Sequence, residues 1–256
     1  QNRDGGIPTF CRGWTNLPFD RSSPDITAHA LRAWLAWLPS MPDIVATRVS
    51  GGVAAALRYL RTSGESDGSW NPLWFGNQHL ASESNPVYGT AKVTRALNCA
   101  VYGRHDDFRA KVVGKTELHP AQLLRELAPT LLVADCGTSG LGWLAGWTQT
   151  KSNDELEGSN EELALTVESL AAAGATKEVQ QLNSALELGS QLLVARVEDG
   201  TWTQPAPIGF YFAKLWYYER LYPMVFTVAA LEAVARLEAV AAGVPPAVEP
   251  RVPPGG

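Results

Sequence analysis

A short motif recurs along this chain and constrains its fold more than any other feature. It consists of an aspartate, a glycine and, two residues after that glycine, a large apolar residue, as in Asp67-Gly68-Ser69-Trp70 and Asp199-Gly200-Thr201-Trp202. Both copies follow a segment with apolar residues at helical spacing. Asp-Gly favours a turn, and the following indole can fold back on the helix end and donate its N–H to a carbonyl. The motif therefore predicts helix ends.

The motif occurs a third time at Asp4-Gly5-Gly6-Ile7, and Gly140-Leu141-Gly142-Trp143 is a looser fourth copy. With all four, the interval is roughly 60–70 residues, about the length of two helices and their turns. A Gly and a Trp could end a single helix without any repeat. Three copies with the same internal spacing favour a repeated unit instead, so we expect a stack of helical hairpins, in which each hairpin buries its neighbour's apolar face.

Helical periodicity extends over most of the chain, and no convincing alternating strand pattern is present. Ser23 and Pro24 provide a cap and a first-turn proline for the first helix. We predict an all-α domain over 1–242, followed by a Pro/Gly-rich disordered tail over 243–256. The predicted helices are 25–38, 45–62, 86–103, 120–133, 160–174, 178–197 and 223–242, with a shorter one over 209–220.

Composition narrows the classes of function. The 256 residues carry a net charge of −5 without a long basic run, which argues against a nucleic-acid partner. Three cysteines without a CxxC pair fit a reduced, cytoplasmic protein, and neither a signal peptide nor a membrane-spanning run is recognisable. Nine tryptophans are many for a helical domain. The chain opens at Gln1 inside a motif, so we expect the natural protein to extend further at its N-terminus.

The repeats resemble the Q-x-x-x-G-x-W motif of squalene-hopene and oxidosqualene cyclases, the class II terpene cyclases. All three copies are imperfect: they are Gln1 to Ile7, Gly64 to Trp70 and Arg196 to Trp202. Further stretches follow the order of the bacterial enzymes over about 1–240, most weakly over 104–158. They are Gly5 to Phe10, Leu17 to His29, Trp74, Val87 to Thr90, Gly209 to Tyr211 and Tyr218 to Pro223. The resemblance implies an incomplete α/α toroid, the C-terminal part of the catalytic domain.

The resemblance assigns Asp25 and His29 to the support of a catalytic acid. Four residues apart on one helix, they share a face. In the family, the matching residues support an Asp-x-Asp-Asp acid that protonates a terminal double bond. This chain contains no such motif, so we expect it to be inactive alone and to need the missing N-terminal part of the enzyme. A helix histidine with ordinary partners and a first-turn acid that favours the helix dipole are the plain alternatives.

The resemblance also assigns aromatic residues to a hydrocarbon pocket. Cyclisation of a polyprene passes through carbocations, which π faces attract without trapping. The matching residues are Phe10, Phe19, Trp74, Tyr88, Tyr211 and Tyr218. Pro207 and Leu215 depart from the family, where a Phe and a Tyr occupy these positions. The resemblance therefore does not identify the cyclised product. Each of these aromatic residues could instead be an ordinary residue of the hydrophobic core.

The expected ligand is a squalene-like polyprene, and no metal or organic cofactor is implied. Because that substrate lives in the bilayer, the resemblance also implies peripheral membrane association. Two alternatives stay open. One is a non-catalytic lipid-binding or scaffold protein. The other is a zinc protein like the prenyltransferase β-subunits, with Cys11, Asp20 and His29 as the nearby ligand types, although these lack that family's Asp-x-Cys spacing.

Overall fold

The computed structural model describes residues 1–9, 20–78, 80–102, 140–151, 158–174, 180–210 and 215–243. This part of the chain is mainly helical and contains seven α-helices. They are α1 (Pro24–Trp37), α2 (Asp43–Ser63), α3 (Pro86–Tyr102), α6 (Gly140–Lys151), α7 (Asn160–Ala173), α8 (Gln180–Glu198) and α9 (Leu221–Ala241). Short 3₁₀ segments, Leu38–Ser40 and Thr201–Thr203, follow α1 and α8. The prediction of an all-α protein is confirmed at this level.

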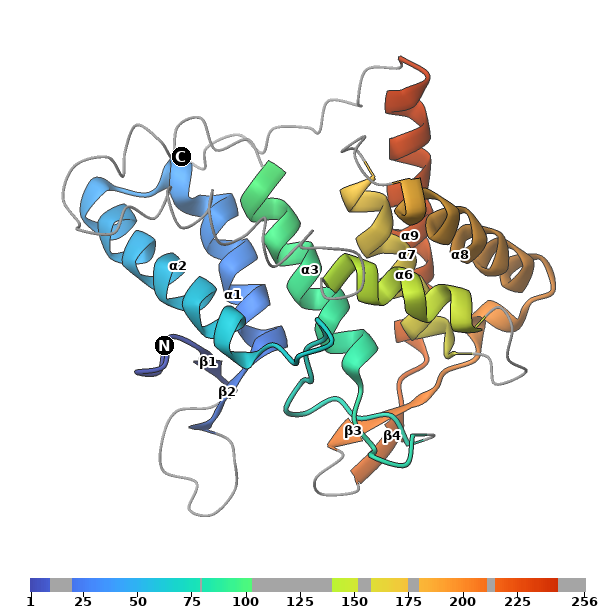
Figure 1. The fold of residues 1–256 in the computed structure, drawn as a ribbon, viewed down its shortest axis with the longest axis horizontal. Helices are drawn as coiled ribbons and strands as arrows, with labels where there is room; N and C mark the ends of the chain where they lie inside the picture. The colour runs from blue at the N-terminus through green and yellow to red at the C-terminus, as the bar shows by residue number, and fades with distance from the viewer. Residues whose placement is uncertain are drawn as a thin grey trace, which may run out of the picture.

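The helices form two rows, and the chain alternates between them (Figure 1). In the inner row α1 packs against α3, α3 against α7, and α7 against α9. The outer row consists of α2, which packs on α1; α6, which packs on α3 and α7; and α8, which packs on α6 and α7. Helices α1, α3 and α7 therefore each have an inner neighbour and an outer cover. The core lies between the rows and includes Leu31, Leu57, Leu97, Leu144, Leu170 and Leu193, all with less than 2% of their surface exposed.

The Asp-Gly turns have one geometry at all three predicted positions. Gly5, Gly68 and Gly200 have φ values of 93°, 88° and 84°, in the left-handed region that glycine tolerates best. In each turn the aspartate accepts a hydrogen bond from the backbone N–H two residues later, at 3.0 Å for Asp4, 3.0 Å for Asp67 and 2.8 Å for Asp199. The predicted turns are thus confirmed.

Side chains beside these turns connect neighbouring elements. The indole N–H of Trp70 donates to the carbonyl oxygen of Leu60 at 2.7 Å, as predicted for a ring folded back on its helix. The Gln1 amide donates to the carbonyl oxygen of Gly52 in α2 at 2.9 Å. Arg196 donates to the Asn160 side chain at 2.9 Å and to the Gly158 carbonyl at 3.0 Å, which ties α8 to the start of α7.

Six predicted helices agree with the structure to within about two residues at each end, and 120–133 lies outside the described residues. The tail over 244–256 lies outside them too. The looser motif copy at Gly140 to Trp143 begins α6 instead of ending a helix, and α6 itself was not predicted. Strands β1 (Ile7–Pro8) and β2 (Ser22–Ser23) form an antiparallel pair ahead of α1.

The predicted helix over 209–220 is wrong. The segment instead contributes to an antiparallel pair of strands, β3 (Pro207–Phe210) and β4 (Leu215–Tyr218), with Pro207 opposite Tyr218 and Phe210 opposite Leu215. The physical reason lies in its composition: glycine disfavours a helix interior, whereas adjacent aromatic residues favour strands. The pair lies near the end of the inner row from which α3 and α9 start (Figure 1).

Candidate functional site

The inner helices each direct one stripe of side chains toward the same region. On α1 the stripe is Asp25, His29 and Arg32; on α3 it is Tyr88, Lys92 and Arg95; on α7 it is Glu161, Leu165 and Glu168; and on α9 it is Tyr222 and Phe226. Members of a stripe are three or four residues apart, so they share a helix face. The electrostatic and ring contacts below connect the stripes across the row.

Asp25 occupies the first turn of α1 and is 2% exposed. The Ser23 hydroxyl donates a hydrogen bond to its carboxylate and itself accepts one from the backbone N–H of Leu73, at 2.9 Å. Burial raises the pKa of Asp25, while the Ser23 hydrogen bond and the charge of Lys92 act in the opposite direction. The carboxyl therefore stands in a protein environment that favours its proton.

His29 lies one turn after Asp25, and its side chain reaches solvent. Desolvation by the surrounding protein, followed by the charges of Lys92 and Arg32, lowers the pKa of His29 to about 4. At neutral pH the ring is therefore uncharged, with one nitrogen able to donate and the other to accept. A carboxylate placed beside it would oppose the effect of the two cations.

Lys92 is the functional candidate that the sequence prediction missed. Its ammonium nitrogen lies 5.1 Å from the ring centroid of Tyr88 and 4.7 Å from that of Phe226, within cation–π range. Burial lowers the pKa of Lys92 to about 8; Glu168 opposes this effect, whereas Arg32 and Arg95 add to it. The signal was available in the sequence, because Lys92 follows the predicted pocket residue Tyr88 by four positions on one helix.

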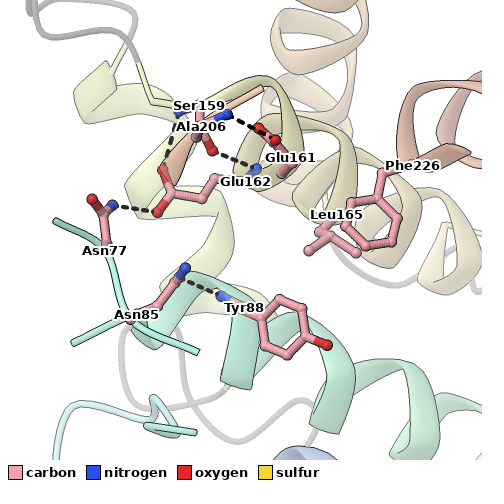
Figure 2. A pocket seen from close by; sticks show the side chains of 10 residues that line it. Asn77, Asn85, Tyr88, Ser159, Glu161, Glu162, Leu165, Ala206 and Phe226 are labelled. Atoms are coloured by element: carbon pink, nitrogen blue, oxygen red, sulfur yellow. Dashed lines mark hydrogen bonds between the residues drawn. The ribbon is translucent and has the colours of Figure 1, made fainter. Parts of the chain in front are cut away.

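A cavity of about 20 Å³ lies next to the rings of Tyr88 and Phe226, at the start of α7 (Figure 2). Glu161 is 4% exposed there. One of its oxygens accepts from the backbone N–H of Ala206 at 2.9 Å, and the other has no hydrogen-bond partner among the described residues. Burial raises the pKa of Glu161. Such a volume holds about one water molecule, which could satisfy the second oxygen.

The neighbouring Glu162 has a different role, because both of its oxygens accept hydrogen bonds. It accepts from the Asn77 side chain at 2.6 Å and from the backbone N–H of Ser159 at 3.1 Å (Figure 2). The Ser159 hydroxyl in turn accepts from the N–H of Glu162, which completes a capping box at the start of α7. Sequence analysis did not single out either glutamate.

Of the predicted aromatic residues that the structure describes, Trp74 is buried, Tyr88 lies on the inner stripe of α3, and Tyr218 is exposed. Tyr88 stacks on Phe75 with ring centroids 4.3 Å apart, and Trp74 is 4% exposed. Burial raises the pKa of Tyr88, and electrostatic interactions with Asp25, Tyr222 and Tyr217 raise it further. Phe10, Phe19 and Tyr211 lie outside the described residues, as does Cys11.

Tyr218 lies apart from this group. Its side chain is 63% exposed and lines a second cleft of about 960 Å³ together with Trp143 and Trp147 of α6. The preceding residue, Tyr217, is instead electrostatically coupled to Tyr88. Successive residues of a strand point to opposite faces, which accounts for the difference between the two tyrosines. Asp20, one of the candidate zinc ligands, is exposed, and its backbone carbonyl oxygen accepts a hydrogen bond from the Asn2 side-chain amide at 2.7 Å.

Within the described ranges, no group of three or more His, Cys, Asp or Glu side chains is placed to hold a metal ion. No helix in the same ranges has both the length and the apolar character needed to cross a bilayer. Comparison of the chain with models of protein families gives no match, and comparison with curated proteins gives none either.

Proposed function

We propose that this chain is the C-terminal portion of a class II terpene cyclase of the squalene-hopene type. In the whole enzyme, an acid from the N-terminal portion protonates a terminal double bond of squalene or a related polyprene. New C–C bonds then form as the positive charge moves along the chain, and the final cation loses a proton or gains water. The reaction uses a side-chain acid and needs no metal or organic cofactor.

The observation that carries the proposal is the joint placement of Asp25, His29 and Tyr88. The acid and the histidine share the inner stripe of α1, and Tyr88, itself coupled to Asp25, occupies the facing stripe of α3. An uncharged histidine beside a buried carboxyl suits the support of a stronger acid, since it can donate a hydrogen bond to the conjugate base. The ring of Tyr88 offers a π face to a nearby cation.

The two rows of helices support the proposal of an incomplete toroid. Alternation between an inner and an outer row is the arrangement that such a ring of helical hairpins requires. At the end of the inner row, α9 exposes Leu221, Val225 and Val228, with 62%, 56% and 59% of their surface accessible. Their spacing of four and three residues makes one apolar face. A further part of the enzyme would cover this face and close the ring.

Membrane association forms part of the proposal, because a polyprene substrate partitions into the bilayer. The whole enzyme would take its substrate from one leaflet while resting on the membrane surface. Peripheral attachment of this kind requires no spanning helix.

Product formation from squalene tests the proposal. The chain alone should give no cyclised product by gas chromatography and mass spectrometry, whereas a protein extended by the natural N-terminal segment with Asp-x-Asp-Asp should give one. In that extended protein, His29→Ala should reduce kcat by at least about tenfold, consistent with the loss of a group that assists proton transfer. Arg58→Ala, at an exposed position on α2, is the control and should leave kcat unchanged.

Cyclised product from the isolated chain would contradict the proposed division of roles. Near-normal turnover of the His29→Ala protein would remove His29 from the mechanism. The absence of product from the extended protein would remove the cyclase activity itself.

A further inference from the structure

The cleft of about 960 Å³ that Tyr218 lines is separate from the inner stripes. It is bordered by the outer helices α6 and α8, which pack against each other, and by the starts of α3 and α7 (Figure 1). Among its described lining residues, Asp25, His29, Tyr88 and Lys92 are absent. Its volume lies within the range of about 300–1,000 Å³ that is usual for small-molecule sites. The cleft therefore has room for a ligand that the proposed cyclisation does not use.

Two tryptophans form the aromatic part of the lining. Trp143 and Trp147 stand four positions apart on α6, so they share a face and lie about 6 Å apart along the helix axis. Both are partly exposed. The indole N–H of Trp143 donates to the carboxylate of Asp67 at 3.1 Å, and the Trp147 ring lies so close to Gly158 that an added Cβ would be 2.5 Å from it. The rings are thus fixed in the free protein, which lowers the entropic cost of binding.

Polar groups with spare hydrogen-bonding capacity line the same cleft. Tyr218 is 63% exposed, and neither its hydroxyl nor the exposed side-chain amide of Gln204 has a hydrogen-bond partner among the described residues. The Oδ1 atom of Asp199 accepts from the backbone N–H and the hydroxyl of Thr201, at 2.8 Å and 2.6 Å, whereas no described residue bonds to its Oδ2 atom. The cleft therefore offers both donors and acceptors beside its aromatic rings.

The charged groups of the cleft disfavour an anionic ligand. Arg196 is the basic residue of the described lining, and its guanidinium already donates to the Asn160 side chain at 2.9 Å. Two acids, Asp199 and Glu162, line the cleft with it. Hydrogen bonds from the Thr201 hydroxyl and backbone lower the pKa of Asp199, which is therefore ionised near neutral pH. A neutral ligand that carries several hydrogen-bond donors fits this combination.

We propose that the cleft binds a neutral oligosaccharide, whose sugar rings pack on Trp143 and Trp147 and whose hydroxyls bond to Asp199, Gln204 and Tyr218. A hexopyranose ring presents C–H groups that can pack on an indole, and hydroxyls that donate and accept. A proline-rich peptide also packs on aromatic rings, but proline lacks the backbone N–H that an acceptor-only carboxylate requires. The inference goes beyond the proposed function and stands whether or not the chain belongs to a cyclase.

Isothermal titration of the chain with cellohexaose, maltohexaose and hexagalacturonate tests the site. At least one of the two neutral hexasaccharides should bind. Hexagalacturonate has a carboxylate on each ring and should bind more weakly than that hexasaccharide by about tenfold or more, because it meets the charges of Asp199 and Glu162. No binding of either neutral hexasaccharide at millimolar concentration would overturn the proposal.

Substitutions in the lining locate the ligand. Tyr218→Ala and Gln204→Ala change exposed side chains, and each should weaken the neutral hexasaccharide by about threefold to tenfold, as one ring contact or one hydrogen bond does. Trp147→Ala should weaken it by about tenfold or more. Trp37→Ala, which removes a 65% exposed indole of α1, and Gln191→Ala, which removes an exposed amide of α8, are the matched controls. Neither lines the cleft, and both should bind as the unchanged protein does.

Asp199→Asn provides a readout that loss of structure cannot imitate. Asparagine keeps an acceptor oxygen for the turn but removes the negative charge. Hexagalacturonate should therefore bind more tightly to this variant than to the unchanged protein. An unchanged affinity would remove Asp199 from the site.

Equal affinities of the neutral hexasaccharide for the unchanged protein, Tyr218→Ala, Gln204→Ala and Trp147→Ala would overturn the placement in this cleft. Decaproline that binds more tightly than both neutral hexasaccharides, and loses affinity in Trp147→Ala, would overturn the ligand class in favour of a proline-rich peptide. Circular dichroism verifies that each variant keeps its helices, and the two exposed changes decide the matter if Trp147→Ala does not fold.

Discussion

Trp70 and Leu60 are joined by a 2.7 Å hydrogen bond from the indole N–H to the backbone carbonyl oxygen, near the end of α2. Trp70 is 2% exposed and Leu60 fully buried, so water cannot replace this contact. The ring covers the end of one helix, while the backbone N–H of Trp70 donates to the hydroxyl of Thr90 in α3 at 3.0 Å. A single residue thus connects the outer row to the inner row.

Replacement of Trp70 by phenylalanine should lower the free energy of unfolding by about 2 kcal/mol or more, because a buried carbonyl loses its donor and the smaller ring leaves space. Trp202→Phe, in the third copy of the motif, is the control: that indole is only half-buried and makes no described hydrogen bond. Urea unfolding followed by circular dichroism measures both. A loss at Trp70 no larger than at Trp202 would show that the hydrogen bond is unimportant.

Gly200→Ala isolates the cost of the left-handed turn. Gly200 has φ of 84°, and no atom lies within 4 Å of an added Cβ, so the penalty comes from the backbone alone. We expect a loss of about 1–2 kcal/mol. Gly51→Ala in α2 also meets nothing within 4 Å but has helical geometry, and it should gain about 0.5–1 kcal/mol. Two changes of the same sign in thermal unfolding would contradict this account.

His29 should make stability depend on pH in one direction. Its pKa is about 4 in the folded chain, against 6.5 as the ordinary value. Between these values the unfolded chain binds more protons, so the His29 contribution to stability is present above pH 6.5 and is lost as the pH falls toward 4. The pKa of Asp25 is raised, so its contribution to stability decreases as the pH rises above its ordinary pKa of 3.8. The two effects oppose each other, so the His29 contribution must be measured as a difference between two proteins.

The comparison of the unchanged chain with His29→Gln isolates that contribution. The slope of stability against pH between 4 and 6.5 should be smaller in the variant. Titration of the imidazole by nuclear magnetic resonance provides the direct value, and an ordinary pKa near 6.5 would contradict the placement of His29 beside Lys92 and Arg32.

Glu161 and Glu162 form a matched pair for mutation. The pKa of Glu161 is raised, so its burial destabilises the fold increasingly as the pH rises above 4.5. Glu161→Gln should therefore be neutral in acid and stabilising at pH 8. Glu162→Gln should lose about 1 kcal/mol at pH 8, because its carboxylate accepts from Asn77 and completes the capping box. Equal effects of the two changes on the midpoint of denaturant unfolding would contradict these roles.

Much of the helical architecture could be predicted because local signals agree there. Ser23 and Pro24 mark the start of α1, and apolar spacing defines most of the other helices. The strands around Phe210 and Leu215 could not be predicted, since short aromatic runs suit a helix or a strand, and the pairing of β3 with β4 decides between them. Helix α6 was not predicted, because its Gly, Trp and Thr residues do not form a clear apolar stripe.

The candidate site was predictable only in part. Asp25 and His29 share a helix, so their common face follows from spacing alone. The role of Lys92 depends on α7 and α9, which lie about 70 to 130 positions further along the chain from α3. That of Glu161, in α7, depends on the distant residues Tyr88 and Ala206. Burial of an ionisable group is a property of such distant packing, and a lysine or glutamate in a helix otherwise reads as solvent-facing.

The four inner helices begin at one end of their row, where the first-turn residue Tyr88 interacts electrostatically with Asp25 and Tyr222 and lines one cavity with Glu161. Their macrodipoles consequently add, and the partial positive charges of four N-termini gather in one small volume. That field offsets part of the cost of burying Asp25, Glu161 and Glu162, all of them first-turn acids. Parallel alignment thus makes this end of the protein tolerant of negative charge, well before any ligand arrives.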